Sequence, residues 1–516
     1  MPEQKKDAQH YMRLLVKTSF FVFLSIFVSK IFGYLYKIVI ARCFGPEQYG
    51  LFSLAVIISG ILITFAMLGL SDGITRFIPF YRGKKDYKKI KHILKISIYI
   101  TLVTSIVSSV LLYLLSDIIA LSIFHNLELS LYLKIISFVG PFAAISSVFL
   151  AVVRGFEKVK TYSVLVNVFQ NGSKLLFLLL LVYLGFEVNS LALSYLLSFV
   201  FLAIFSYVIG MKTLKAIAIK GSLKAEEKAK TTRELFSYSW PFIFVGLLYT
   251  LFYWTDSLVL GYFEQATYVG IYNAAITLVS LFGIAPDLFM QLFLPLITAR
   301  YSENKRAMIR NLTKQVSKWI FMINLPLFMV IVAFPGVIIN FFFGSEFLIA
   351  ETPLRILALG ALFSGFLSLL FGLISMKGDS KIILKSYLIF AIINLILDIF
   401  FIKFWGMTGA AIATASAGIL FTFSFTHIIK KRLGFFPYKG ILVKIVLVTA
   451  TLLGVLFVLE RLVAPTFINL VIIGFVFILA YLSLIILTGC LDKNDWMILK
   501  AVGSKIKRIS GRGINP

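Results

Sequence analysis

The chain has 516 residues, of which 60% are hydrophobic and only 14% charged, and its mean hydropathy is +0.96. Soluble proteins carry roughly 25% charged residues, so this composition excludes a soluble globular fold. The formal charge of +27 does not indicate a nucleic-acid partner, because the basic residues lie in short segments between apolar runs and not on one soluble face.

Long apolar runs, bounded by charged residues, proline and glycine, fill most of the chain. They are continuous and not alternating, which excludes barrel strands, and most are close to the ~20 residues that a helix needs to cross the hydrocarbon core. The first run is far longer than a signal-peptide core, so we interpret it as a retained helix. The sequence therefore predicts fourteen membrane-spanning helices, near residues 15–40, 49–72, 93–115, 131–153, 161–184, 188–211, 236–261, 267–292, 317–340, 354–376, 382–403, 407–429, 441–460 and 467–489.

Lys and Arg residues alternate between the two sides of the predicted membrane. Of the 50 such residues, 42 fall in the two termini and in every second loop, Arg154 among them. Loops rich in Lys and Arg stay on the cytoplasmic side, so both termini of this predicted cell-membrane protein are expected in the cytoplasm. One missed or added helix would disrupt the alternation, which supports the count of fourteen.

The two halves of the chain resemble each other. The segment FGPEQYGLFSLAVII (44–58) matches FEQATYVGIYNAAITL (263–278), which aligns Gly50 with Gly270. FIPF (77–80) then pairs with FLPL (293–296), and LGFEVNSLA (184–192) pairs with WGMTGAAIA (405–413). Three matches in order at nearly constant offset predict two six-helix repeats in one orientation, a known transporter plan. The predicted parts are an N-lobe (1–212), a basic cytoplasmic linker (213–235), a C-lobe (236–430), two further helices (431–490) and a basic cytoplasmic tail (491–516).

Helix 1 carries two lysines within its predicted span. Lys30, Tyr34 and Lys37 are spaced i, i+4 and i+7, so they share one face. Ionisable groups inside a membrane usually face a cavity or one another, and Lys30 is too deep for its ammonium group to reach the interface easily. Lys37 is nearer the outer surface, so it either lines a cavity or extends its ammonium group to the interface. Tyr34 adds an aromatic face suited to a sugar ring, although interfacial belts are the commoner reason for membrane aromatics.

Helix 5 carries a polar stripe that ends in a lysine near the middle of the membrane. Asn167, Gln170, Asn171 and Lys174 are spaced i, i+3, i+4 and i+7. The stripe is expected to face water or another helix, because polar groups facing lipid are unfavourable. Hydrogen bonds between helices are the alternative interpretation, and they do not require the lysine.

Carboxylates occupy the corresponding places in the second half. Asp256, Asp287, Asn394 and Asp398 align near Lys37, Asp72, Asn171 and Lys174 respectively. A cavity between the halves would then bind an anion on one wall and a cation or protons on the other. Ion pairs between the lobes would give the same pattern, and Asp72 with Arg76, spaced i, i+4, form either a self-neutralising pair or part of such an interface.

Lysines in a low-dielectric cavity favour an anionic substrate such as a phosphate or diphosphate. The sequence predicts no catalytic or metal site, because its two cysteines are expected at opposite membrane faces and its four histidines are scattered. It predicts no cofactor, and leaves a coupling ion, sodium or proton, as the one small species that the carboxylates could bind.

Three segments resemble the polysaccharide-export or Wzx-type flippases of the multidrug, oligosaccharidyl-lipid and polysaccharide exporter superfamily. They are SKIFGYLYKIVIARCFGPEQYGLFSLA (29–55), LGLSDGITRFIPFYRGKKD (68–86) and YWTDSLVLGYFEQATYVGIYNAA (253–275). The resemblance implies two six-helix lobes around a cationic cavity and alternating access. It implies a polyprenyl-diphosphate oligosaccharide, flipped to the external leaflet for glycan assembly, as the substrate. It also places Lys30, Lys37, Arg76, Lys174 and Asp256 at positions of cavity or interface charge, with lysine in helix 1 where the family often has arginine.

Four alternatives are weighed against this interpretation. A multidrug extruder of the same superfamily usually has twelve helices and a membrane-embedded acid in its first lobe. A peptidoglycan-precursor flippase shares the fourteen-helix plan and a polyprenyl-diphosphate substrate, so charge does not distinguish it. A membrane glycosyltransferase, ligase or polymerase would need a larger external loop, and a purely structural protein would not need Lys30 and Lys174 in mid-membrane.

Overall fold

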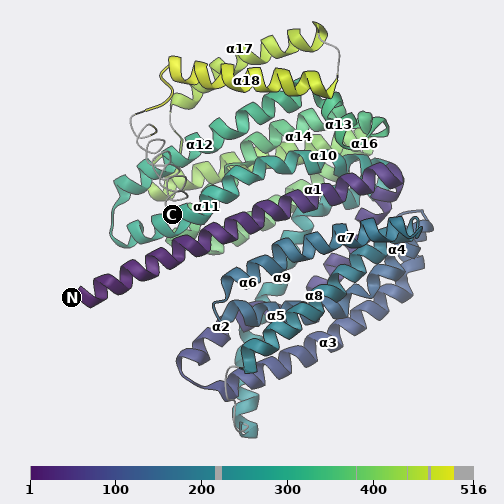
Figure 1. Cartoon of the computed structure of the whole chain (residues 1–516), viewed down its shortest axis with the longest axis vertical. Helices are drawn as coiled ribbons and strands as arrows, with labels where there is room; N and C mark the ends of the chain where they lie inside the picture. Colours follow the sequence, from purple (N-terminus) through teal and green to yellow (C-terminus); the bar gives the residue numbers. More distant parts are fainter. Residues whose placement is uncertain are drawn as a thin grey trace, which may run out of the picture. The chain divides into compact units, whose positions relative to one another are not determined.

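The computed structural model describes residues 2–215, 223–378, 380–438, 440–462, 466–492 and 495, and the regular elements in these ranges are all helical (Figure 1). This confirms the predicted all-α membrane fold. The α-helices are α1 (Pro2–Ala66), α2 (Leu70–Gly83), α3 (Tyr87–Ile118), α4 (Glu128–Ser137), α5 (Val139–Gly155), α6 (Val159–Ser163), α7 (Gln170–Tyr183), α8 (Asn189–Lys215), α9 (Ala225–Phe263), α10 (Ala266–Val279), α11 (Ile284–Ser302), α12 (Arg306–Ala333), α13 (Pro335–Phe342), α14 (Glu351–Ser364), α15 (Leu367–Lys377), α16 (Ser380–Leu433), α17 (Ile441–Leu462) and α18 (Phe467–Leu487).

Two of the helices are kinked at glycines. Twelve stretches of the described chain are long and apolar enough to cross a membrane, and Phe21–Ala66 in α1 is 46 residues long. A straight helix of that length would measure roughly 69 Å, more than twice the hydrocarbon thickness. Gly45 (φ 76°) interrupts α1 and Gly406 (φ 52°) interrupts α16, each between two predicted spans. The count of fourteen stays a prediction, and it requires each kink to separate two passes.

Contacts divide the chain into two compact units. Unit 1 comprises Met1–Val279, Phe342–Leu357 and Ser380–Ala417, and unit 2 comprises Ser280–Phe341, Ala358–Asp379 and Gly418–Pro516. The predicted N-lobe lies wholly within unit 1. Helix α9 begins at Ala225, so the second half of the predicted basic linker is helical. The division of the chain into lobes at 212 and 236 stays a prediction.

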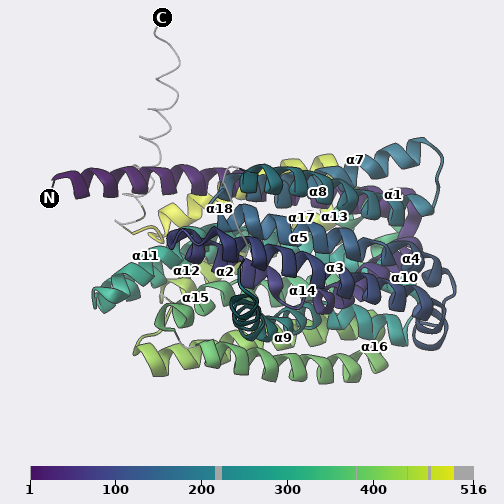
Figure 2. The same ribbon diagram turned by 90° about the horizontal axis from the view of Figure 1, so that it is seen from below.

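Helix α1 is the central element of unit 1. It packs against α4, α7, α9 and α10, and it lies beside α7 in both views (Figure 1 and Figure 2). Polar contacts join the apolar surfaces, as is usual between membrane helices: the hydroxyls of Tyr36 in α1 and Ser194 in α8 lie 3.2 Å apart. These contacts set the orientation of α1 and therefore of the face that carries Lys30 and Lys37.

The predicted fifth span contains a π-helical segment. Residues Val159–Tyr183 form one apolar stretch, but Val164–Phe169 between α6 and α7 winds as a π-helix. A π-turn holds an extra residue and is found frequently at functional sites. Asn167 lies in this segment and Gln170, Asn171 and Lys174 follow it in α7, so the four residues do not share one regular α-helical face.

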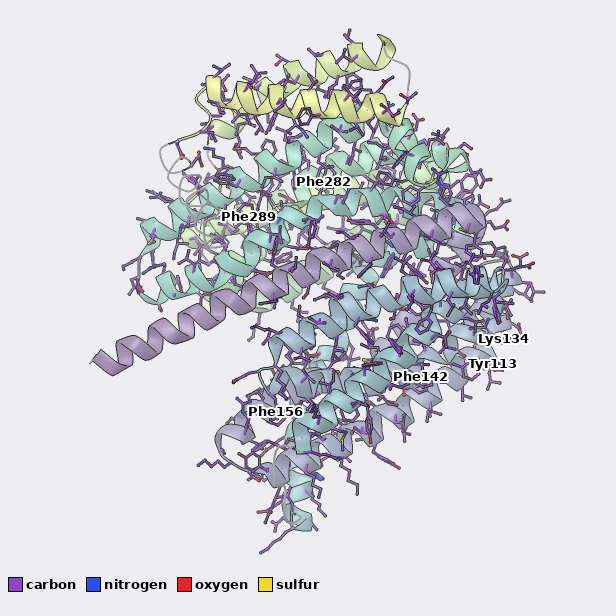
Figure 3. The ribbon with its side chains drawn as sticks, in the orientation of Figure 1. Tyr113, Lys134, Phe142, Phe156, Phe282 and Phe289 are labelled. Carbon is purple, nitrogen blue, oxygen red and sulfur yellow. The ribbon has the colours of Figure 1, made fainter. Side chains whose placement is uncertain are left out.

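The connection between α3 and α4 is held by an ion pair. Lys134, labelled in Figure 3, lies 2.8 Å from Asp117 Oδ1, and the Ser130 hydroxyl donates to the same carboxylate. The labelled Tyr113 ring packs edge-on against Phe138 nearby. Lys134 is one of the few lysines outside the basic loops, and here a carboxylate balances its charge.

In unit 2, the segment after α18 is attached to α12. Lys318 of α12 is fully buried and pairs with the fully buried Asp495, and it lies 3.7 Å from Asp492. Gln315 and Trp319, on the same helix, also donate to Asp495. Helices α17 and α18 pack on α12 as well. Four polar contacts and two apolar helices therefore hold the C-terminal end of the described chain to one helix.

Candidate functional site

Three lysines of unit 1 form a cationic cluster. Lys30 and Lys37 lie on α1 and Lys174 lies on α7, and all three side chains are partly buried. The ammonium group of Lys37 is repelled by that of Lys30, and that of Lys174 is repelled by that of Lys37. Packing of α7 against α1 thus brings together charges that lie 137 residues apart, and an anion bound among them would relieve the repulsion.

A hydroxyl group of α10 engages Lys37. The Lys37 ammonium donates to Thr277 Oγ1 at 3.1 Å, and the Tyr49 hydroxyl lies 3.4 Å from the same atom. Thr277 in turn donates to the carbonyl of Asn273 at 2.7 Å. This chain of hydrogen bonds links the predicted first span to a helix of the second repeat through a neutral acceptor.

Aromatic rings of α8 lie beneath Lys174. Its ammonium group is 4.8 Å from the centre of the Tyr195 ring and 5.7 Å from that of Phe199. A cation over an aromatic face is stabilised without losing its charge. These two rings therefore hold the Lys174 ammonium group in place. Tyr34 lies between Lys30 and Lys37 along α1, and its side chain is partly buried.

The remaining residues of the helix 5 stripe have different neighbours. Asn171 donates to Ser29 Oγ on α1 at 2.9 Å, and Asn167 donates to Ser163 Oγ at 3.0 Å. Gln170 instead lines a cavity. The hydrogen bond from Asn171 joins two helices, which is the alternative interpretation of this polar stripe. A substrate-binding role for Asn167, Gln170 and Asn171 stays a prediction.

A cavity of about 450 Å³ lies within unit 1, between α1, α2, α5, α7 and α8. Asp72 of α2 and Arg154 of α5 both line it, and the positive charge of Arg154 acts on the Asp72 carboxyl. The Arg76 guanidinium lies elsewhere, 4.1 Å from the centre of the Tyr238 ring of α9. Asp72 and Arg76 therefore have different partners and do not neutralise each other as an i, i+4 pair.

A second polar site of unit 1 is acidic. Asp256 of α9 is 5% exposed, and its Oδ2 accepts from Tyr272 at 2.8 Å and from Thr414 at 3.3 Å. Asp398 of α16 is fully buried, and its Oδ2 accepts from Asn394 at 2.6 Å. The two carboxylates repel each other electrostatically. In the described part of the chain, Asp398 Oδ1 has no hydrogen-bond donor, so this site offers carboxyl oxygens to a cation or a proton.

Asp287 belongs to unit 2, whereas the lysine cluster, the cavity and the acidic site belong to unit 1. It occupies the first turn of α11, in unit 2. Its predicted role at a lobe interface stays a prediction, as do the interface roles of the other carboxylates.

Several residues of these sites were not predicted from the sequence, and four of them illustrate why. They are Arg154, Tyr272, Thr277 and Thr414. Arg154 was counted among the basic loop residues, and its position one residue beyond a predicted span gives no sign of a cavity. The other three are ordinary hydroxyl side chains in apolar helices, and only tertiary contacts distinguish them.

Comparison with known proteins identifies the family. A family model described as "Polysaccharide biosynthesis protein" matches residues 15–285, and the MatE model matches residues 241–400. The lipid II flippase MurJ of Bacillus subtilis is 24% identical over 491 residues, which is 86% of this chain and 87% of that protein. The probable low-salt glycan biosynthesis flippase Agl15 of Haloferax volcanii is 27% identical over 198 residues, 38% of this chain and 42% of that one.

A solved structure shares the fold. The structure of lipid II flippase MurJ in an inward closed conformation superposes with a TM-score of 0.69 at 18% identity, covering 90% of this chain and 98% of that one. The matched family model covers more than half of the chain, and its residues include the cationic cluster, the cavity and Asp256. The chain is a multi-pass membrane protein that belongs to the polysaccharide biosynthesis protein family.

Proposed function

We propose that this protein is a flippase that moves a polyprenyl-diphosphate-linked oligosaccharide from the cytoplasmic to the external leaflet of the cell membrane. The observation that carries the proposal is the cluster of Lys30, Lys37 and Lys174, three cations on packed helices inside the membrane. A diphosphate suits such a cluster because its charge offsets their mutual repulsion. The described relatives that act on lipid-linked or glycan substrates support the same substrate class.

The transport cycle that we propose is alternating access of two lobes, 1–212 and 236–430, with both termini in the cytoplasm. The lysine cluster belongs to the first lobe and binds the diphosphate. The carboxylates Asp256 and Asp398 belong to the second, and they bind a coupling cation, sodium or proton. Opposite charges in the two lobes keep the substrate and the coupling ion at separate sites. The protein itself only transports the lipid-linked oligosaccharide. Glycan-assembly enzymes act on this lipid before and after it is flipped.

The proposal is tested with purified protein and a defined probe. In proteoliposomes, a fluorescently labelled farnesyl-diphosphate-linked N-acetylglucosamine is protected from a membrane-impermeant quencher until it is flipped outward. Replacing both Lys30 and Lys174 by alanine removes two charged contacts to the diphosphate. Such contacts contribute about 1.5–3 kcal/mol each, so farnesyl diphosphate affinity is expected to fall by a factor of at least about 100 and flipping to cease.

Lys91→Ala is the matched control, because Lys91 is an exposed residue of α3 and the same charge is lost outside the cluster. It is expected to bind and flip like the wild type. Full flipping by a folded Lys30→Ala, Lys174→Ala variant would overturn the assignment of the diphosphate site. Flipping of a labelled phosphatidylcholine at the same rate would overturn the substrate class.

A further inference from the structure

The cavity inside unit 1 has a lining unlike that of the lysine cluster. Hydroxyl groups occur along its walls at Ser71, Thr75, Ser146 and Ser147, and Gln170 supplies an amide. Its volume of about 450 Å³ lies within the ~300–1,000 Å³ of small-molecule sites. Its lining residues on α5 run from Ala143 to Arg154, a span of roughly 16 Å along the helix. The cavity is therefore long, and its largely apolar wall carries several polar groups.

Hydrogen bonds within the helices determine what the hydroxyls offer. Thr75 donates to the carbonyl of Ser71, and Ser146 and Ser147 donate to the carbonyls of Ala143 and Ala144. Their protons are used, so their oxygens are left as acceptors toward the cavity. Ser71 Oγ has no partner among the described residues. The wall thus presents several acceptors, together with donors from Gln170 and Arg154.

One end of the cavity combines both signs of charge. The Arg154 guanidinium is 5.6 Å from the centre of the Tyr162 ring, and its charge acts on Asp72. The charges of Asp72 and Arg154 are opposite and offset each other, so this end does not favour a second phosphate. It favours a neutral ligand with hydroxyl groups, because such groups both donate to a carboxylate and accept from a guanidinium.

The other end of the cavity meets the lysine cluster. Tyr195 and Phe199 line the cavity, and the ammonium group of Lys174 lies over both rings. Gln170, one helical turn before Lys174, lines the cavity as well. A molecule with a diphosphate at Lys174 would thus have an adjoining chamber of acceptors, donors and aromatic faces. These are the groups that recognise a pyranose ring.

We infer that this cavity is a sugar subsite. It holds the first sugar units attached to the diphosphate while the lysine cluster holds the diphosphate itself. Gln170, Asp72 and Arg154 bond the sugar hydroxyls, and Tyr162 and Tyr195 supply aromatic faces. The inference rests on the proposed function, since it assumes a diphosphate at Lys174, and it adds that the protein discriminates among lipid-linked glycans by this sugar.

The test compares two probes on purified protein by microscale thermophoresis. One is farnesyl diphosphate, which has no sugar, and the other is farnesyl-diphosphate-linked N-acetylglucosamine. Wild-type protein is expected to bind the sugar-linked probe roughly tenfold more tightly, the gain of one or two net hydrogen bonds. Ser147→Phe fills the cavity, so it is expected to remove this preference while farnesyl diphosphate affinity stays within about twofold of the wild type.

Two further variants keep the test decisive if Ser147→Phe does not fold. Gln170→Leu and Thr75→Val remove polar groups at nearly constant volume, and each is expected to reduce the preference for the sugar-linked probe. Val107→Phe, at an exposed position of α3, adds bulk away from the cavity and is expected to change neither affinity.

The outcomes separate this inference from the function on which it rests. Equal binding of both probes by the wild type, or an unchanged preference in folded cavity variants, overturns the sugar subsite alone. An equal loss of both probes in Ser147→Phe also overturns it, because the cavity would then hold the lipid chain. If the wild type does not bind farnesyl diphosphate at all, the diphosphate site fails and the subsite fails with it.

Discussion

Gly50 of α1 and Gly270 of α10 touch each other in a reciprocal contact. A Cβ atom on Gly50 would lie 1.8 Å from the carbonyl oxygen of Ala266, and one on Gly270 would lie 1.9 Å from that of Pro46. The two glycines are 220 residues apart, and so are Pro46 and Ala266. Equivalent residues of two repeats meet in this way where a pseudo-twofold axis passes between them, as the sequence alignment of the two segments implies.

Gly50→Ala is therefore expected to destabilise the protein. The added methyl group would overlap backbone atoms of α10, and overpacking of this kind costs about 1–3 kcal/mol or more. Thermal unfolding of the purified protein should show a lowered midpoint. Gly33→Ala is the matched control on the same helix, since a Cβ there has nothing within 4 Å, and it is expected to leave stability unchanged or raise it by up to about 1 kcal/mol. A normal midpoint for Gly50→Ala would contradict the close crossing.

Thr277→Val is expected to weaken the attachment of α1 to α10. The change keeps the shape of the side chain but removes the acceptor for Lys37, and a buried donor left unpaired costs about 1–3 kcal/mol. The thermal midpoint should fall accordingly. Thr277→Ser keeps the hydroxyl and should restore it. If valine and serine behave alike, the hydrogen bond contributes nothing to stability.

Asp495→Ala is expected to be among the most damaging single changes in unit 2. Lys318 has no exposed surface, and removing one member of a buried ion pair costs about 3–5 kcal/mol because the other charge stays buried. Asp495 also accepts from Trp319 at 3.0 Å, so indole fluorescence should report the loss together with thermal unfolding. Glu303→Gln disrupts only the exposed pairs with Arg300 and Lys305 and is expected to change little. Equal effects of the two variants would argue against the attachment of the C-terminal segment to α12.

Asp398→Asn is expected to abolish the effect of the coupling cation. With wild-type protein, sodium chloride should raise the thermal midpoint above that in choline chloride if sodium binds at Asp256 and Asp398, since ligands that bind only the folded state stabilise it. If protons bind there, the midpoint should depend on pH and not on sodium. The asparagine variant has an amide in place of the ionisable carboxyl group, so it has one side-chain oxygen fewer and should lose either response. Persistence of the same response in a folded Asp398→Asn protein would exclude this site.

Hydropathy and charge were enough to predict the membrane fold, because apolar runs of spanning length have few other stable arrangements. The glycines at 45 and 406 fall between predicted spans, where continuous helix would be too long for the bilayer. The lysines were also detectable, since a charge inside an apolar run stands out from its neighbours. The contacts of these lysines were not detectable, because the acceptor of Lys37 is 240 residues away and is a common threonine.

The contacts of the acidic site were likewise predictable only in part. Asn394 and Asp398 are spaced i, i+4, so their hydrogen bond follows from one helical turn. Tyr272 and Thr414 reach Asp256 from two other helices, and no local pattern marks them. Arg154 illustrates a different difficulty: the same guanidinium that satisfies the charge rule for a cytoplasmic loop also lines a cavity, and the sequence assigns only the first of these roles.

The π-helical turn Val164–Phe169 sets the direction of every side chain that follows it in the same span. Each residue of an α-helix advances the direction by about 100°. If the same residues were wound as a regular α-helix, α7 would be rotated by about that angle, and Lys174 would move away from the rings of α8. The π-helical turn thus determines which side chains of α7 face α8 and the cavity.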